Sequence, residues 1–392
     1  MTNKKIAVIG RGTGGAMSVA HFKRWTDWEI EWYFDPQIQT QAVGEGSALV
    51  VPINLLNCFN FSHEELPKID GTFKTGIAKE GWGKSGNYFF HDFPPPHISY
   101  HFNALKLQQY VMGKLQHKVK IIESNVKHDE IDADFILDCS GKPNNFEEYY
   151  KAEYIPVNSV HVTQCYWDYP KFQHSLNIAK KYGWIFGIPL QNRCSIGYLY
   201  NKDINTLDEV KEDVKEIFER YNLTPSDTTN SFHFGNYYHK QNFTDRLAYN
   251  GNASFFLEPL EATSFGMIDL INRTALDMWN NNITIVGAQT KYLNKINQIQ
   301  NMIMMHYFAG SKYKTKFWEY AENRGIECLR RAKTDNNFVE ICDMSMIMSS
   351  FSEIVQQRYD IDYGTWPVGS FFQNINGLDI KPELVKLLHE TI

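Results

Sequence analysis

The sequence is poor in the features that mark secreted, membrane-bound or nucleic-acid-binding proteins. Its six cysteines show no CxxC spacing, which argues against a disulfide framework or a zinc site and favours reduced thiols. No signal-peptide pattern follows Met1, and no apolar run is long enough to span a bilayer. The formal net charge is only −6, with both signs spread along the chain. We therefore expect a cytoplasmic protein that binds no metal, no membrane and no nucleic acid.

Low-complexity tracts and internal repeats are absent as well. What the chain does have is length and apolar bulk, because 392 residues with 43% hydrophobic content suffice for one large domain or two. Aromatic residues make up 15% of the chain. They can line a pocket for a flat ligand, although most aromatic side chains in any protein belong to the core.

The clearest motif is a glycine-rich turn between a strand and a helix. Residues 4–10 read as a buried parallel strand, and residues 16–24 read as a helix. Between them lies a GxGxxG turn, which lets the backbone approach a pyrophosphate at the helix N-terminus. The candidate residues of this turn are Gly10, Gly12, Thr13, Gly14 and Gly15.

Asp35 ends the second predicted strand, 20 residues after Gly15. A carboxylate at this distance is expected to bind the ribose of a dinucleotide. Its alternative role is to form the turn before Pro36. The motif thus predicts a dinucleotide site without saying whether the ligand is FAD or NAD.

Three later segments favour FAD. Residues 43–47 form a glycine-rich turn, and residues 133–141 and 247–253 each form a strand followed by a small-residue turn. The nucleotide domain is therefore expected to be discontinuous. No second GxGxxG is present, so we expect reduced flavin to come from a separate NAD(P)H-dependent flavin reductase.

Lys74 lies beside Phe73 and Ile77 in a strand-like run, which is unusual company for a surface lysine. Burial would make the charge and the pKa of its ammonium adjustable, as chemistry requires. The alternative is a lysine that snorkels from a strand edge.

Several segments together resemble the flavin-dependent halogenases of the tryptophan halogenase type. Residues 72–77 with Trp82 are similar to the stretch around that family's essential lysine. Residues 256–264 are similar to the segment that carries its catalytic glutamate and halide site. Further similar segments are residues 86–93, 99–104, 183–190 and 292–318.

The resemblance implies an α/β fold. We expect a Rossmann-like FAD-binding domain of the aromatic hydroxylase/glutathione reductase type over residues 1–270, with a sheet-containing substrate insertion at about 145–245. Residues 271–392 should form a helical region that closes the substrate pocket, with helices at 294–308, 317–332 and about 337–357.

The resemblance also implies the chemistry. Reduced FAD and O2 would oxidise a bound halide to hypohalous acid, which Lys74 would capture as a haloamine or through a hydrogen bond. Glu261 would stabilise the cationic ring intermediate and take its proton. Its alternative role is an ion pair at a helix start, and Glu258 is the less favoured carboxylate. Thr263 and Ser264 would contact the halide (chloride, bromide or iodide), although Thr263 in the alternative only caps the helix expected over 267–279.

Further residues follow from the same resemblance. The substrate is expected to be a small, indole-type aromatic molecule, and a homodimer is left open. Trp184 and Phe186 would form a wall between substrate and flavin, or simply a buried strand. The expected substrate or pocket residues are His101, Phe102, Trp184, Phe186 and Trp366. The additional FAD-binding residues are Gly44, Glu45, Gly46, Ser47, Asn252 and Pro259.

The chain also departs from the family pattern. Phe186 replaces a tryptophan, Asn252 replaces an acid, and the strap between Glu45 and Pro52 looks longer than usual. These departures leave two other functions open. One is an aromatic flavin monooxygenase, and the other is a non-catalytic flavin-binding protein.

Overall fold

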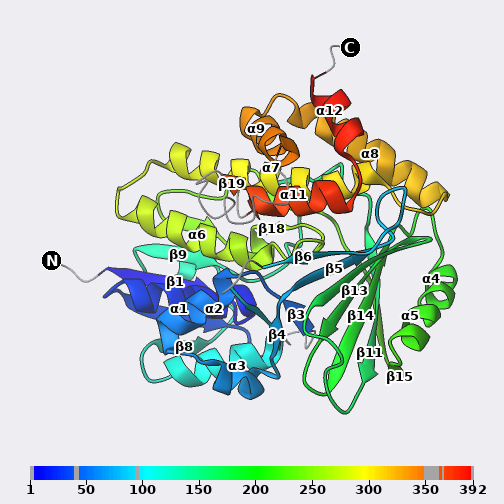
Figure 1. Cartoon of the computed structure of the whole chain (residues 1–392). Coiled ribbons are helices and arrows are strands. Elements are labelled where there is room, and N and C mark those ends of the chain that lie inside the picture. Colours follow the sequence, from blue (N-terminus) through cyan, green and yellow to red (C-terminus); the bar gives the residue numbers. More distant parts are fainter. Residues whose placement is uncertain (1–3, 39–43, 94–96, 348–361, 364–365, 390–392) are drawn as a thin grey trace.

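The structure is a computed structural model that describes residues 4–38, 44–93, 97–347, 362–363 and 366–389. Figure 1 shows a nucleotide-side sheet next to a larger second sheet, with most of the C-terminal helices above both. None of the helices among the described residues is long and apolar enough to cross a membrane.

The first sheet is parallel throughout and contains the glycine-rich turn. Its order is β17-β9-β1-β2-β8. Its strands are β1 (Lys5–Ile9), β2 (Glu29–Phe34), β8 (Lys120–Glu123), β9 (Phe135–Asp138) and β17 (Leu247–Tyr249). A buried apolar run such as the one in β1 is typical of a parallel strand covered on both faces. Because β17 joins β9 in the sheet, this sheet is discontinuous in sequence.

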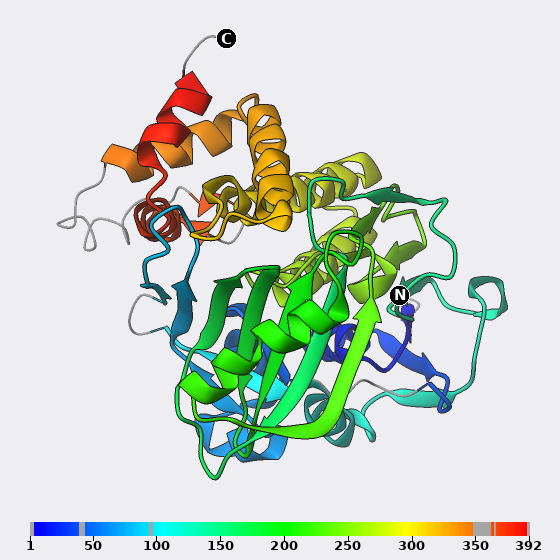
Figure 2. The ribbon, with the colours of Figure 1, turned by 90° about the vertical axis from the view of Figure 1, so that its right-hand side faces the viewer.

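The second sheet has seven strands in the order β15-β11-β14-β13-β12-β5-β6. They are β5 (Gly76–Glu80), β6 (Phe89–Asp92), β11 (Ser159–Tyr166), β12 (Ser175–Lys180), β13 (Gly183–Pro189), β14 (Arg193–Tyr200) and β15 (Thr224–His233). Helices α4 (Leu207–Asp213) and α5 (Lys215–Arg220) pack on one face, as Figure 2 shows. The strands β5 and β6 therefore bring residues 76–92 into a sheet that is otherwise made from residues 159–233.

A small third sheet lies between the other two. It has the order β3-β7-β4, with β3 (Gly44–Gly46), β4 (Thr72–Lys74) and β7 (Ser99–Asn103). The chain leaves β4 at Lys74 and enters β5 at Gly76, so Thr75 separates two strands of different sheets. Lys74 and Lys79 therefore do not lie on one continuous strand.

The C-terminal third is helical, as predicted. Its helices are α6 (Ser264–Trp279), α7 (Ile285–Ala309), α8 (Lys316–Ala332), α9 (Asn336–Ile347), α11 (Val368–Gly377) and α12 (Lys381–His389). The Thr284 and Thr315 side chains cap α7 and α8. Helix α6 begins three residues before the predicted Met267. The predicted end of the third helix at residue 357 lies outside the described residues.

Further elements complete the described chain. They are α1 (Thr13–Trp25), α2 (Val50–Phe59), η1 (His63–Ile69), α3 (Ala104–Leu115), η2 (His128–Glu130), β10 (Tyr149–Lys151), β16 (Tyr237–His239), η3 (Gly251–Ala253), β18 (Phe255–Phe256), β19 (Asp362–Tyr363) and β20 (Trp366–Pro367). The α/β fold class is confirmed, whereas the division into domains at residue 270 stays a prediction.

Candidate active site

The glycine-rich turn leaves room for a nucleotide beside the first helix. Gly10 has a φ of 101°, and a Cβ there would lie 2.2 Å from the carbonyl oxygen of Cys139. A Cβ on Gly12, by contrast, would meet no heavy atom within 4 Å. Helix α1 (Thr13–Trp25) begins here with no side-chain cap and no acidic residue in its first turn. Its first amides thus stay available to a pyrophosphate, so these residues fit the dinucleotide.

Close packing explains the other two glycines of the turn. A Cβ on Gly15 would lie 1.9 Å from the carbonyl oxygen of Gly10. A Cβ on Gly14 would lie 3.3 Å from the Cα of Gly251 in η3, next to Asn252. The exposed Asn252 therefore lies close to the turn, where the resemblance implies contact with FAD.

Asp35 keeps both of its expected roles open. Its Oδ1 atom accepts a hydrogen bond from the Gln37 amide at 2.8 Å, which is the turn-forming contact. The other carboxylate oxygen accepts no hydrogen bond from the described residues, so it can still receive a ribose hydroxyl. Ribose binding by Asp35 remains a prediction.

The strap segment begins with β3 and lies against the glycine-rich turn. The Thr13 hydroxyl donates a hydrogen bond to Glu45 at 3.4 Å, and burial raises the pKa of Glu45 to about 7 despite that bond. The Ser47 hydroxyl donates to the Tyr100 carbonyl at 2.8 Å and so ties the strap to β7. Part of the longer loop expected before Pro52 is helical, because α2 begins at Val50.

Glu261 lies in a tight turn that leads into α6. The Ala262 amide donates to the carbonyl of Pro259 at 3.0 Å, and Ala262 has a φ of 53°, which is unusual for a residue with a side chain. Thr263 is the N-cap residue, yet its side chain makes no capping hydrogen bond. The capping alternative for Thr263 therefore receives no support, and the first amides of α6 have no side-chain acceptor.

A second lysine, Lys79 of β5, forms a buried ion pair with Glu261. Its ammonium also donates to His306 Nε2 of α7 at 2.6 Å and to Asn374 Oδ1 of α11 at 2.7 Å. The other oxygen of Glu261 accepts a 3.4 Å hydrogen bond from the Trp366 indole and lies 3.6 Å from His91 Nδ1. Sequence reasoning missed Lys79 and Asn374, whose partners lie up to 295 residues away.

The hydrogen bonds fix how these polar groups are oriented. His306 Nδ1 lies 3.0 Å from the Met302 carbonyl, so that nitrogen carries the proton and Nε2 accepts from Lys79. The Asn374 amide donates to the Ser370 carbonyl at 2.9 Å, which leaves its oxygen for Lys79. The cluster of Lys79, Glu261, His306 and Asn374 is thus internally consistent.

Charge makes Glu261 an ionised carboxylate although it is fully buried. Burial alone would raise its pKa. The positive charge of Lys79 outweighs burial and holds the pKa of Glu261 well below its usual range. A buried, ionised carboxylate is equipped to stabilise a cation or to accept a proton.

Lys74 is also buried, but it is not paired. Its ammonium lies 5.6 Å from the centre of the Phe93 ring, and a Cβ on Gly46 of the strap would lie 3.6 Å from its nitrogen. Burial lowers the pKa of Lys74 to about 8. The negative charge of Glu261 opposes this shift, and the positive charge of Lys79 adds to it. The snorkelling alternative does not hold, because Lys74 is only 1% exposed.

The expected wall residues occupy different environments. Trp184 is buried, and its indole donates to Glu258 Oε2 at 3.1 Å, which also accepts from the Tyr307 hydroxyl at 2.8 Å. Burial raises the pKa of Glu258 to about 8 despite these bonds, so this second carboxyl is protonated at neutral pH. Phe186 is partly exposed, and its ring lies over Gly197, where a Cβ would be 2.0 Å away.

Of the expected pocket residues, only Trp366 contacts Glu261. His101 is buried between the Thr72 hydroxyl at 3.2 Å and the Ser175 hydroxyl at 3.0 Å, on the strap side of the site. Phe102 is fully buried and packs edge-on against Phe265. Their contacts with a substrate stay predictions.

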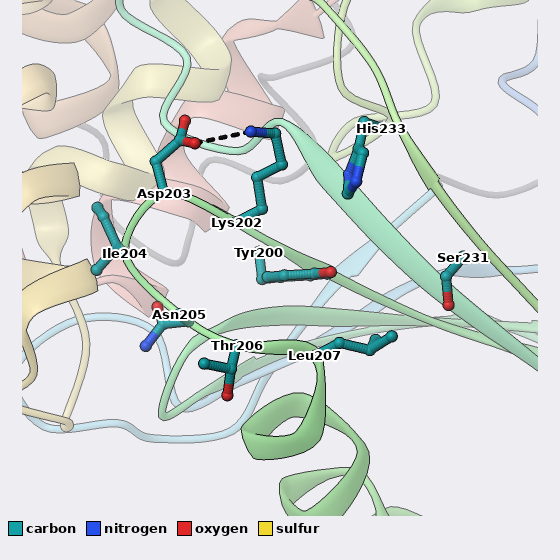
Figure 3. A pocket seen from close by; sticks show the side chains of 9 residues that line it. All are labelled: Tyr200, Lys202, Asp203, Ile204, Asn205, Thr206, Leu207, Ser231 and His233. Carbon is teal, nitrogen blue, oxygen red and sulfur yellow. Dashed lines mark hydrogen bonds and ion pairs between the residues drawn. The ribbon is translucent and has the colours of Figure 1, made fainter.

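A surface pocket elsewhere in the molecule shares no lining residue with this site. Figure 3 shows it at the ends of β14 and β15, next to the start of α4, with Lys202 paired to Asp203 at 2.8 Å.

In the described part of the chain, no group of three or more His, Cys, Asp or Glu side chains has the arrangement of a metal site.

Known proteins share this fold and sequence pattern. Among solved structures, a tryptophan halogenase from Shewanella frigidimarina superposes with a TM-score of 0.78 at 16% identity, covering 98% of this chain and 93% of that one. A flavin-dependent halogenase from Xanthomonas campestris gives 0.77 at 17% identity, with the same coverage. At the sequence level, tryptophan 6-halogenase of Streptomyces toxytricini is 18% identical over 93% of this chain and 90% of its own length.

The model of the tryptophan halogenase family matches residues 5–128 and 111–383, which is nearly the whole chain. Such coverage includes the glycine-rich turn, both lysines and the Glu261 segment. The chain therefore belongs to the tryptophan halogenase family of flavin-dependent enzymes.

Proposed function

We propose that this protein halogenates a small, indole-type aromatic molecule, using reduced FAD, O2 and a halide ion. The observation that carries the proposal is the buried, ionised Glu261 held by Lys79 at the start of α6, with Lys74 in the same interior. The known relatives include enzymes named as tryptophan halogenases, which supports an indole-type substrate.

When bound, reduced FAD supplies the oxidation: with O2, a proton and a halide it gives oxidised FAD, water and hypohalous acid. The glycine turn and the start of α1 would hold its pyrophosphate. Thr263, Ser264 and the first amides of α6 would hold the halide, because the N-terminus of a helix attracts anions. A separate flavin reductase would deliver the reduced flavin.

Two groups of this chain would act on the ring. Lys74 captures the hypohalous acid and presents its halogen to one ring carbon, which is positioning combined with electrostatics. As the ring electrons bind the halogen, the ring becomes cationic, and the carboxylate of Glu261 stabilises it and accepts the displaced proton. Trp366, which contacts Glu261, would pack against the ring.

The direct test uses the full chain with FAD, NADH, a flavin reductase, O2, and indole or tryptophan, with chloride, bromide and iodide in turn. A product whose mass shows the halogen replacing hydrogen supports the proposal. A product that gains one oxygen would instead support the monooxygenase. Flavin binding without product from a broad set of aromatic compounds would favour the non-catalytic protein.

A further inference from the structure

Two buried lysines approach the same carboxylate from different strands. Lys74 ends β4 and Lys79 lies in β5, and the charge of Glu261 acts on both. The reaction proposed above needs one amine to receive a halogen and one carboxylate held in place. The question is which lysine does which task.

The hydrogen bonds of Lys79 leave it no free donor. An ammonium has three N–H groups. Those of Lys79 reach Glu261 Oε1, His306 Nε2 and Asn374 Oδ1, three acceptors from three different segments. A hypohalous acid would have to displace one of them, and burial makes a broken contact in such a network costly.

Lys74 is in the opposite situation. It makes no hydrogen bond and no ion pair with any of the described residues, and the ring of Phe93 lies 5.6 Å away. It also lies beside Gly46 of the strap, whose neighbour Glu45 is bonded to the glycine-rich turn. Lys74 thus has free donors and lies on the side from which an oxidant made at the flavin would arrive.

We propose that Lys79 is a positioning residue, which holds Glu261 ionised and in place, while Lys74 keeps the free donors that the proposed function requires of it. This inference rests on the proposed function for the identity of the oxidant. The hydrogen bonds alone distinguish a lysine whose donors are all used from a lysine whose donors are free.

The transfer balances in two steps. The neutral Lys74 amine attacks the halogen of the hypohalous acid, the N–halogen bond forms and the O–halogen bond breaks, and the amine proton leaves with hydroxide as water. The ring then attacks the halogen, the N–halogen bond breaks, and its electron pair stays on nitrogen. The ring proton passes to Glu261 and then to that nitrogen, which regenerates the neutral amine.

The first test does not depend on halogenation. The FAD-loaded full chain is labelled with 13C at the lysine ε carbons and titrated by NMR, with the two signals assigned by Lys74→Met and Lys79→Met. The Lys74 signal should titrate near pH 8, and the Lys79 signal should stay in its charged form to higher pH. If Lys79 loses its proton first, the inference is wrong whether or not the enzyme halogenates.

The second test measures product and stray oxidant together, with 2-chlorodimedone as a trap for free hypohalous acid. Lys74→Met should lose at least about 100-fold of the indole product while the trap is still halogenated, as expected when the group that binds a reactive species is removed. Retention of wild-type product by Lys74→Met would overturn the inference.

Lys79→Met should lower product formation and also change its pH profile. The groups that face Glu261 are Lys74, Lys79, His91 and His306. Without Lys79, the pKa of Glu261 rises, so the acid limb of kcat should move up by roughly one pH unit or more. An unmoved acid limb would mean that Lys79 does not hold Glu261. Lys215→Met, at an exposed ion pair in α5, is the matched control and should change neither readout.

Discussion

Glu258 and Glu261 are two buried carboxyl groups three residues apart, and their surroundings drive their protonation in opposite directions. Neutral donors, Trp184 and Tyr307, surround Glu258, so burial prevails and the pKa rises to about 8. An ammonium contacts Glu261 and lowers its pKa. The pair illustrates how an ionised carboxylate and a neutral carboxyl can share one loop.

Replacing each of these two glutamates by glutamine should therefore lower the free energy of unfolding by different amounts. Glu261→Gln leaves the buried Lys79 charge without its counterion and should lower the free energy of unfolding by about 3 kcal/mol or more. Glu258→Gln replaces a group that is already neutral and should cost less than about 1 kcal/mol. Urea unfolding at pH 5, where the raised pKa of Glu258 has little effect on stability, measures both costs.

A double variant separates the ion pair from general packing. In Lys79→Met/Glu261→Gln both charges are absent, so much of the loss seen in Glu261→Gln should be recovered. Equal destabilisation by Glu258→Gln and Glu261→Gln would show that the ion pair of Glu261 does not determine the loss of stability.

The raised pKa of Glu258 also predicts a pH dependence of stability. Between about pH 4.5 and 8 the folded protein keeps a proton that the unfolded chain has released, so stability falls as pH rises through this window. Glu258→Gln has no such proton. The difference in free energy of unfolding, variant minus wild type, should therefore increase by about 3 kcal/mol between pH 5 and pH 8.

Unfolding curves of both proteins across this range provide the measurement. Glu45, whose pKa is raised to about 7, gives the same sign in both proteins and cancels in the difference. A difference that stays constant with pH would mean that Glu258 is ionised in the folded state.

At the residue scale, the sequence revealed Glu261 and Lys74 but not Lys79. In one continuous strand, residues five apart point to opposite faces, so a buried Lys74 would have placed Lys79 on the other side. The break at Thr75 changes this parity and brings both ammonium groups under the influence of Glu261. Nothing in the local composition marks such a break.

Among the elements, α6 has a start that suits an anion. Its first turn carries no acidic residue, and Thr263 leaves its amides uncapped. A helix with this start gains stability from a negative charge, whether from a bound halide or from a side chain.

Ser264→Asp should therefore act on stability and activity in opposite directions. The new carboxylate should stabilise the helix start by about 0.5 kcal/mol and compete with the halide, raising the halide KM by about 10-fold. Thermal unfolding and halide-dependent initial rates measure the two effects. Ser264→Asn, similar in size but uncharged, is the control, and an unchanged KM in Ser264→Asp would place the halide elsewhere.

At the element scale, periodicity predicted the parallel strands and the C-terminal helices well. The starts of the helices were less accurate, as for α7, which begins at Ile285 where residue 294 was expected. Its extra turns follow the Thr284 cap and include polar residues that blur the apolar spacing. The seven-stranded sheet was only partly anticipated, because pairing of β5 with β12 joins segments about a hundred residues apart.

At the scale of the whole molecule, the nucleotide site predicts a ligand-dependent stability. Saturating FAD, at about 100 times its Kd, should add about 2.7 kcal/mol and raise the unfolding temperature, whereas FMN, which lacks the adenosine half, should do so less. Asp35→Asn keeps the turn-forming oxygen but loses the charge, so it should weaken FAD binding by about 10-fold without changing the melting of the FAD-free protein. Equal binding by both proteins would assign Asp35 to the turn alone.

The overall fold could be predicted because the glycine turn, its flanking elements and the later segments agree with one another. The site could be predicted only in part. Its residues come from β5, the loop before α6, α7 and α11, and the contacts of His306 and Asn374 depend on how helices far along the chain pack.

The contribution of α11 has a consequence for the order in which the protein becomes competent. The ribosome completes the nucleotide sheet by Tyr249, well before Asn374 is made. During that interval a chain can already fold around flavin while Lys79 and Glu261 lack their last partner. Because Asn374 follows the last strand of that sheet by a long stretch of chain, the cluster of Lys79 and Glu261 gains this partner only after the nucleotide sheet can already form.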